Sequence, residues 1–247
     1  MKTILSHPIA RLFYTFPLIL FFLNSCTYSG ANVEKGDGNV VSNSHQVGFF
    51  NSIELYGAYQ VTLTQGEQAS VVVETDNNLQ ELVTVSVDNE TLHVSSQRDK
   101  ALRPTRMDLL IVYPALEKLA VSGASKISAT GPLVMERLHL DMSGATDLQF
   151  DLHVQTLITQ VAGAGNIHFG GTALEHRIDL SGASNLSAED LITESTTITL
   201  SGAGSANIHA SQAMTAKLSG IGRITYHGHP PTTNIQKSGL GSIRPAN

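Results

Sequence analysis

The sequence predicts an all-β fold, a single-stranded parallel β-helix with coils of about 19 residues, on three observations. A Ser-Gly-Ala-Ser tetrapeptide recurs at near-constant spacing along the second half of the chain. Apolar residues flank each copy at two-residue steps, which is the period of a strand that turns alternate side chains inward. Charged residues are only 15% of the chain and Trp is absent, so small and β-branched residues must fill the core.

The segment 1–25 has the features of a secretory signal. A basic segment precedes an apolar run over 12–23, which is too short to span a bilayer comfortably. The tetrapeptide Leu-Asn-Ser-Cys at 23–26 resembles the lipobox of bacterial lipoproteins, in which the cysteine is lipidated and becomes the new N-terminus. We therefore expect 1–25 to be a lipoprotein signal peptide and Cys26 to carry the lipid. The alternative is a plain signal peptide with an incidental cysteine.

Residues 26–45 are rich in Gly, Asn and Ser, which predicts a flexible tether between the lipidated Cys26 and a β-helix domain over 46–247. Loss of the two basic residues in the signal peptide changes the net charge from −6 to −8. That charge repels an anionic membrane surface, so attachment would depend on acyl chains. The expected location is the outer membrane of a bacterial cell envelope, facing either the periplasm or the outside.

The regular repeats span 119–243 and comprise seven copies at slightly variable spacing. Each copy has glycine at its second position, where we expect a sharp corner between two strands, because glycine permits positive φ and close backbone approach. These corner glycines are Gly123, Gly144, Gly163, Gly182, Gly202, Gly220 and Gly239. Recurring flanks favour coils stacked about 4.8 Å apart over a hairpin meander. The variable coil length and the lack of a hexapeptide pattern favour the right-handed form.

Residues 46–118 alternate as strands but repeat less clearly. Because a solenoid end exposes apolar side chains and strand edges, we expect this segment to form irregular early coils that act as a cap. At the other end, Lys237 interrupts the inward column, so the last coil should end in solvent.

Several of these segments together resemble one family. They are residues 53–63, residues 71–79, and residues 113–125, which lead into the first Ser-Gly-Ala-Ser, with the closing Gly-Leu-Gly-Ser-Ile at 239–243. The sequence is similar to the putative auto-transporter adhesin, head GIN domain family of secreted bacterial proteins, over about residues 46–244. The resemblance implies a β-helix of pectin-lyase-like shape, an envelope location and an adhesive role. It implies no catalytic residues.

Composition and motifs disfavour most kinds of chemistry. The net charge of −6 without a basic cluster argues against nucleic-acid binding, and a single cysteine excludes disulfides and thiolate zinc sites. We find no Gly-x-Ser-x-Gly elbow and no Ser, His and Asp set. His227 and His229 form a close pair without a third ligand. We therefore expect no enzyme activity, no cofactor and no metal site.

A few outward-facing residues remain as candidates for interactions. The repeat register places Lys126 beside Asp147 as a surface ion pair, and Asn166 beside Asn185 as an amide ladder. Asp151 near Asp147 is a candidate for a weak cation site, with a solvated face as the simpler interpretation. The candidate aromatic contacts for a glycan are Tyr56, Tyr59, Tyr113 and Tyr226.

These features predict a non-enzymatic envelope lipoprotein whose β-helical rod serves adhesion or surface interaction, with a glycan or a protein as the ligand and the membrane as partner through Cys26. One alternative is a polysaccharide-active β-helix enzyme that depends on Asp147 or Asp151. Another is a structural spacer within the envelope.

Overall fold

The computed structural model describes residues 32–97 and 100–246, so the predicted signal peptide and Cys26 lie outside the described residues. The all-β prediction is confirmed, because the only helical segment in the described part of the chain is a short 3₁₀ helix, η1 (Asn77–Leu82). Fifteen strands form one open sheet, and β1 (Asn32–Lys35) and β8 (Lys100–Arg103) form a separate parallel pair.

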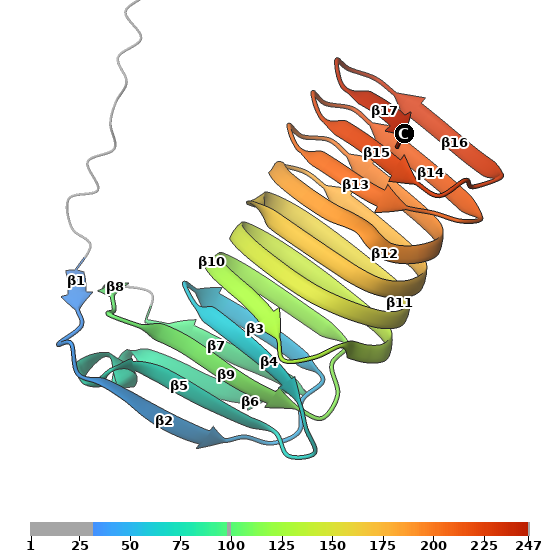
Figure 1. The fold of residues 1–247 in the computed structure, drawn as a ribbon. Helices are drawn as coiled ribbons and strands as arrows, with labels where there is room; N and C mark the ends of the chain where they lie inside the picture. The colour runs from blue at the N-terminus through green and yellow to red at the C-terminus, as the bar shows by residue number, and fades with distance from the viewer. Residues whose placement is uncertain (1–31, 98–99, 247) are drawn as a thin grey trace, which may run out of the picture. The chain divides into compact units, whose positions relative to one another are not determined.

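The second half of the chain pairs with itself in parallel. Each turn of chain lies beside the next in chain order (Figure 1). Register partners are equivalent residues of successive copies, as for Leu119 with Leu140 and Ser205 with Arg223. The strands involved are β10 (Lys118–Ala129), β11 (Leu133–Leu180), β12 (Ala183–Leu200), β13 (Ser205–His209), β14 (Ala213–Leu218), β15 (Arg223–His227), β16 (Thr232–Lys237) and β17 (Ser242–Pro245).

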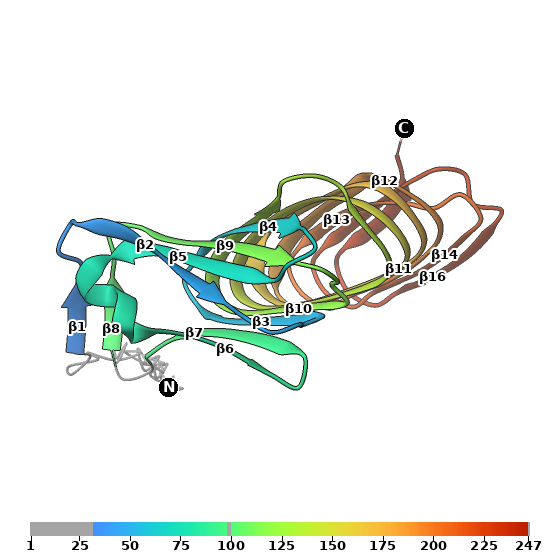
Figure 2. The ribbon, with the colours of Figure 1, turned by 90° about the horizontal axis from the view of Figure 1, so that it is seen from below.

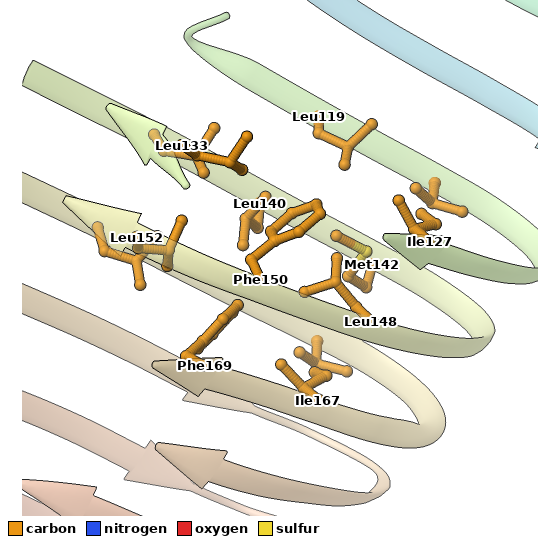
Figure 3. Packing of buried hydrophobic residues seen from close by; sticks show 14 of the residues in the cluster. Leu119, Ile127, Leu133, Leu140, Met142, Leu148, Phe150, Leu152, Ile167 and Phe169 are labelled. Atoms are coloured by element: carbon orange, nitrogen blue, oxygen red, sulfur yellow. The ribbon is translucent and has the colours of Figure 1, made fainter. Parts of the chain in front are cut away.

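Inward side chains of successive turns pack on one another to form the core. Leu148 and Phe150 lie on one turn, and Ile167 and Phe169 lie at the matching positions of the next (Figure 3). All four are at most 3% exposed, and the residue between the two members of each pair, Gln149 or His168, is exposed. Burial of one such side chain contributes about 1.5–3 kcal/mol, so the two-residue alternation predicted from the sequence is what holds the turns together.

The first turn of this arrangement comes from a part of the chain whose repeat was not recognised in the sequence. β3 (Ser52–Gly57) and β4 (Gln60–Gln65) pair in parallel with the two halves of β10, with Ile53 opposite Leu119 and Val61 opposite Ile127. β7 (Thr91–Ser96) pairs in parallel with β3, and β9 (Met107–Tyr113) pairs in parallel with β4. Residues 66–118 therefore interrupt the repeat without breaking the register on either side.

Antiparallel strands end the sheet on the N-terminal side. β5 (Ser70–Asp76) pairs antiparallel with β9, β2 (Val40–Gln46) with β5, and β6 (Val83–Asp88) with β7. Figure 2 shows β5 and β2 beside β9, and β6 beside β7. Of these pairs only β6 and β7 form a hairpin, whereas β2, β5 and β9 come together from distant parts of the chain. Their antiparallel pairing covers the strand edges that the first turn would otherwise expose.

The structure differs from the flexible tether predicted over 26–45. From Asn32 onward this segment is largely strand, as β1 and β2. It is held by backbone pairing with β8 and β5 and by the carboxylate of Asp76, whose Oδ1 accepts a hydrogen bond from the backbone N–H of Gly38 at 2.8 Å. Because β2 is mostly exposed, it carries no clear apolar alternation, and its composition resembles that of a linker.

The C-terminal turn lacks a following neighbour. β16 pairs only with β14, and β17 pairs only with β15, so each has one free edge within the described residues. Every residue of β16 is exposed, including Lys237 at the position where the inward column was expected to end.

Candidate functional site

The seven corner glycines stack directly on one another. A Cβ built on Gly163 would overlap the carbonyl oxygen of Gly144, and one on Gly182 would overlap the carbonyl oxygen of Gly163. The same relation holds along the column of Gly57, Gly123, Gly144, Gly163, Gly182, Gly202, Gly220 and Gly239. Within this column, positive φ occurs only at Gly57, Gly123, Gly144 and Gly239. Close approach to the backbone of the preceding corner is the constraint that the seven glycines from Gly123 to Gly239 share, whereas a Cβ on Gly57 would meet the side chain of Tyr59.

Gly57 belongs to this column although its repeat is hard to recognise. It is the register partner of Gly123, within Tyr56-Gly57-Ala58-Tyr59. The signal was present in the flanks, because Ile53, Leu55, Val61 and Leu63 occupy the same offsets from the corner as in the later copies. The two tyrosines in place of serines hid the likeness.

In three copies the serine before the corner glycine bonds to the preceding turn. The hydroxyl Oγ of Ser143 donates to the carbonyl oxygen of Val121 at 3.3 Å, and Ser181 donates to Val161 at 3.3 Å. The alanine after the glycine is exposed in the five copies that have one, from Ala124 to Ala203. The exposed side chain at the corner is therefore a single methyl group in these five copies.

A polar ladder runs along the outward face just after the corners; we use this name for Asp147, Asn166, Asn185 and Ser205. Asp147 Oδ1 accepts hydrogen bonds from the backbone N–H and side-chain Nδ2 of Asn166 at 3.1 and 3.0 Å. Asn185 Nδ2 donates to Asn166 Oδ1 at 3.3 Å, and Ser205 Oγ donates to Asn185 Oδ1 at 2.8 Å. The predicted amide ladder is therefore confirmed, and it extends over four turns.

The predicted ion pair between Lys126 and Asp147 is wrong. Their backbones are register partners, but no ion pair in the described chain joins the two side chains. The carboxylate instead binds the two N–H groups of Asn166 on the following turn, and such charge-assisted hydrogen bonds compete well with an exposed ion pair.

Two of the tyrosines predicted as glycan contacts lie in the core. Tyr59 is 4% exposed and Tyr113 is fully buried, and burial raises the pKa of each phenol to about 12. Tyr59 also donates a hydrogen bond to the carbonyl oxygen of Tyr56 at 3.1 Å. Tyr56 itself is 42% exposed and donates to Glu54 Oε2 at 2.9 Å, so of these three it alone offers a ring to solvent.

A cleft of about 480 Å³ lies where the chain passes from β9 to β10, beside the start of β11. We call it the β9–β11 cleft. Its polar lining comes from Gln65, Glu117, Glu136, Arg137, Gln155 and Thr156, with Leu116, Val134 and Met135 as apolar neighbours. The hydroxyl of Tyr113, another lining residue, is buried and has no hydrogen-bond partner among the described residues. The lining thus combines amides, carboxylates and a guanidinium with apolar surface.

A second cavity of about 390 Å³ brings Asp151 together with His168 and Gln149. Asp147 does not line it and is part of the polar ladder. The two carboxylates singled out in the sequence thus serve different surfaces. Across residues 32–97 and 100–246, no group of three or more His, Cys, Asp or Glu side chains is placed to hold a metal ion.

No helix in the described part of the chain is both long and apolar enough to cross a membrane. Similar folds occur among solved structures. A putative adhesin from Bacteroides fragilis matches with a TM-score of 0.84 and 23% identity, covering 86% of this chain and 100% of that one. A putative adhesin from Parabacteroides merdae matches at 0.69 and 19%, covering 88% and 100%. A structure described as a putative lipid binding protein, from Parabacteroides distasonis, matches at 0.71 and 18%, covering 87% and 100%.

At 23% identity or less, these structural likenesses establish the fold alone. A comparison with curated proteins finds no match. The family model described as "Putative auto-transporter adhesin, head GIN domain" matches residues 49–230, which include β3 and the corner glycines from Gly57 to Gly220. The chain belongs to the putative auto-transporter adhesin, head GIN domain family.

Proposed function

We propose that this protein is a non-enzymatic adhesin of the bacterial cell envelope, built as a right-handed parallel β-helix that presents long polar faces to a glycan or a protein. The observation that carries the proposal is the polar ladder on a stack of parallel turns, in a chain that belongs to an adhesin family. Parallel pairing between equivalent residues of successive copies supports the β-helix, since one coil then returns to the position of the last.

The ladder suits recognition because its spacing is fixed by the backbone. Neighbouring parallel strands lie about 4.8 Å apart, so amide and hydroxyl groups recur along the face at that interval. Rigid arrays of this kind bind without a large ordering cost, because their side chains already hold one another in place. The β9–β11 cleft adds a concave site with room for one or two sugar rings.

The proposed attachment is a lipid on Cys26, with the mature protein in the outer membrane and facing either the periplasm or the outside. The lipobox-like tetrapeptide at 23–26 supports it. Metabolic labelling with a fatty-acid analogue tests this step, and a Cys26→Ser variant should lose the label. Protease accessibility on intact cells then decides between the two orientations.

The adhesion proposal is tested by deleting the gene and measuring attachment of cells to host matrix and to neighbouring cells. We expect attachment to fall and to return with the wild-type chain. A variant that combines Asn166→Ala, Asn185→Ala and Gln155→Ala should express at the wild-type level and fail to restore attachment. Unchanged attachment after deletion, together with no binding of the purified protein to envelope or host fractions, would end the proposal.

A polysaccharide-active enzyme is the second candidate function, and one observation favours it: Asp151 and His168 line the same cavity. If the protein turns over a polysaccharide and loses that activity in Asp151→Ala or His168→Ala, catalysis and not adhesion is its function. A structural spacer predicts neither attachment nor turnover, and cross-linking in intact envelopes would then capture only envelope neighbours.

A further inference from the structure

The charge of this protein is distributed very unevenly along the stack. All the acidic residues precede Ser195, while the segment 195–247 carries Lys217, Arg223, Lys237 and Arg244 and no acid. These four basic residues lie on β14, β15, β16 and β17, and all are exposed. No ion pair in the described chain involves any of them. The last two turns therefore form a basic end on a protein whose net charge is −6.

The same two turns also depart from the plain corners of the earlier copies. At the position after the corner glycine, five copies carry an exposed alanine, but the last two carry Ile221 and Leu240. Ile221 is 73% exposed and Leu240 is 89% exposed. Adjacent turns bear them, because the backbone N–H of Gly241 donates to the carbonyl oxygen of Gly220 at 3.3 Å. Two large, exposed aliphatic residues thus lie on the corners of adjacent turns.

Two of the four cations lie close to this apolar corner. Arg223 follows Ile221 by two positions, and Lys237 is held against the corner, where its Nζ donates to the carbonyl oxygen of Gly241 at 3.1 Å. Ile235, on the free-edged strand β16, is 46% exposed. We call the set of Ile221, Leu240, Lys217, Arg223, Lys237 and Arg244 the C-terminal tip.

We propose that the C-terminal tip docks on an anionic lipid bilayer, with Ile221 and Leu240 inserted at the headgroup boundary and the four cations against the lipid phosphates. Exposed aliphatic groups beside uncompensated cations are the two components that anionic membranes attract. The net negative charge does not prevent this. The last strand of the stack that carries carboxylates is β12, which lies two strand spacings, or about 9.6 Å, before β16. Lys217, on the intervening strand β14, is opposite Thr199 and not opposite a carboxylate. Charge interactions are screened over about 8 Å at physiological salt.

A second copy of this chain fits the tip less well. Symmetric end-to-end packing would bring two sets of uncompensated cations together, and like charges at an interface oppose association. The inference is independent of the adhesion proposal, since it concerns the end of the stack and not the polar ladder or the β9–β11 cleft.

Vesicle co-sedimentation of the full chain carrying Cys26→Ser tests the proposal, because this variant cannot use an acyl anchor. We expect binding to vesicles of phosphatidylglycerol and phosphatidylcholine in equal parts, weak binding to phosphatidylcholine alone, and loss of binding at high salt. Replacing Ile221 and Leu240 by alanine, the residue of the earlier corners, should lower the partition coefficient at least tenfold. Arg223→Gln with Arg244→Gln should lower it about tenfold.

Matched controls remove the same kinds of group elsewhere. Leu174→Ala with Ile192→Ala removes exposed aliphatic groups, and Lys126→Gln with Arg177→Gln removes exposed cations, so both pairs should bind as the parent does. Circular dichroism checks that every variant is folded. Equal vesicle binding by tip and control variants would overturn the proposal. So would a stable dimer, measured without vesicles, that Ile221→Ala and Leu240→Ala dissociate, or vesicle binding that millimolar inorganic phosphate abolishes.

Discussion

The imidazole of His176 and the hydroxyl of Thr159 meet inside the core, with Nε2 and Oγ1 3.1 Å apart. His176 is 2% exposed, and its ring packs edge-on against Phe169 with centroids 5.8 Å apart. The register partner of His176 on the next turn is Thr196, which is also a buried polar residue. Burial lowers the pKa of His176 to about 3, so the ring is neutral in the folded protein.

This burial makes stability depend on pH in a defined direction. In the unfolded chain His176 takes up a proton below a pKa of 6.5. In the folded protein it stays neutral down to its lowered pKa of about 3. The free energy of unfolding should therefore fall between these values as pH falls, by up to about 1.4 kcal/mol per pH unit from this group. Urea unfolding of the wild type and of His176→Leu at pH 7.5 and pH 5 measures it.

The difference in pH-dependent stability between the wild type and His176→Leu gives the contribution of His176. His176→Leu should lose less stability than the wild type on going to the lower pH, while His229→Gln, at an exposed histidine, should follow the wild type. Parallel pH curves for the wild type and His176→Leu would contradict the assignment of a buried neutral ring.

The stacked corner glycines predict that replacing one of them by alanine greatly lowers the free energy of unfolding. The added methyl of Gly163→Ala would overlap the carbonyl oxygen of Gly144, and neither backbone can move without shifting its neighbours in the stack. We expect a loss of about 3 kcal/mol in the free energy of unfolding. Gly48→Ala, where nothing lies within 4 Å of the new methyl, should change it by less than about 0.5 kcal/mol. Thermal or urea unfolding distinguishes the two, and similar small effects would rule out close stacking at the corner.

Asp76 is expected to stabilise the N-terminal end through its charge. Its carboxylate is fully buried, with Oδ1 on the N–H of Gly38 at 2.8 Å and Oδ2 on the N–H of Thr105 at 2.7 Å. Burial alone would raise its pKa from 3.8, but the hydrogen bonds from Thr105 and Gly38 outweigh burial and lower the pKa. Stability from this group is therefore present above the unfolded pKa and is lost as pH falls through the lower folded pKa.

Asp76→Asn should lower the midpoint of thermal unfolding by several degrees at neutral pH, because one carboxylate oxygen becomes an NH₂ group that faces a backbone N–H. The difference from the wild type should shrink toward pH 3. Asp88→Asn, at an exposed carboxylate, is the control and should leave the midpoint nearly unchanged. A loss that stays constant across this pH range would show that the charge of Asp76 is unimportant.

The polar ladder predicts energetic coupling between its members. Asn166→Ala removes hydrogen bonds to both Asp147 and Asn185 and should cost about 1 kcal/mol. Combined with Asn185→Ala, the total should be less than the sum by about 0.5 kcal/mol, because the second substitution finds one bond already lost. A double-mutant cycle in urea measures the coupling. If the two losses in the free energy of unfolding were strictly additive, the side chains would be adjacent without stabilising one another. Gln236→Ala, on the exposed strand β16, is the control for removing a surface amide outside the ladder.

The regular half of the fold could be predicted because the same short pattern of apolar residues around a glycine recurs in every copy. Inward residues such as Leu148 and Ile167 recur at fixed offsets from Gly144 and Gly163, so the sequence contains both the strand period and the register. The turn that includes Gly57 obeys the same offsets, but tyrosines replace its serines and residues 66–118 separate it from the next copy, so its repeat is hard to recognise in the sequence. The burial of Tyr59 and Tyr113 follows from the same alternation, which places them inward whatever their polarity.

The sequence by itself determined an all-β chain, its repeat, the corner glycines and the pairing of Asn166 with Asn185, because parallel stacking brings equivalent residues of successive copies together. Only the tertiary structure decided that β5 pairs antiparallel with β2 and with β9 and that Asp76 holds residues 36–38, since those partners are distant in sequence and share no period. It also decided that the corners of Ile221 and Leu240 are adjacent and exposed and that Lys237 bonds to Gly241 there, because only stacking places the corners of two successive copies on one edge.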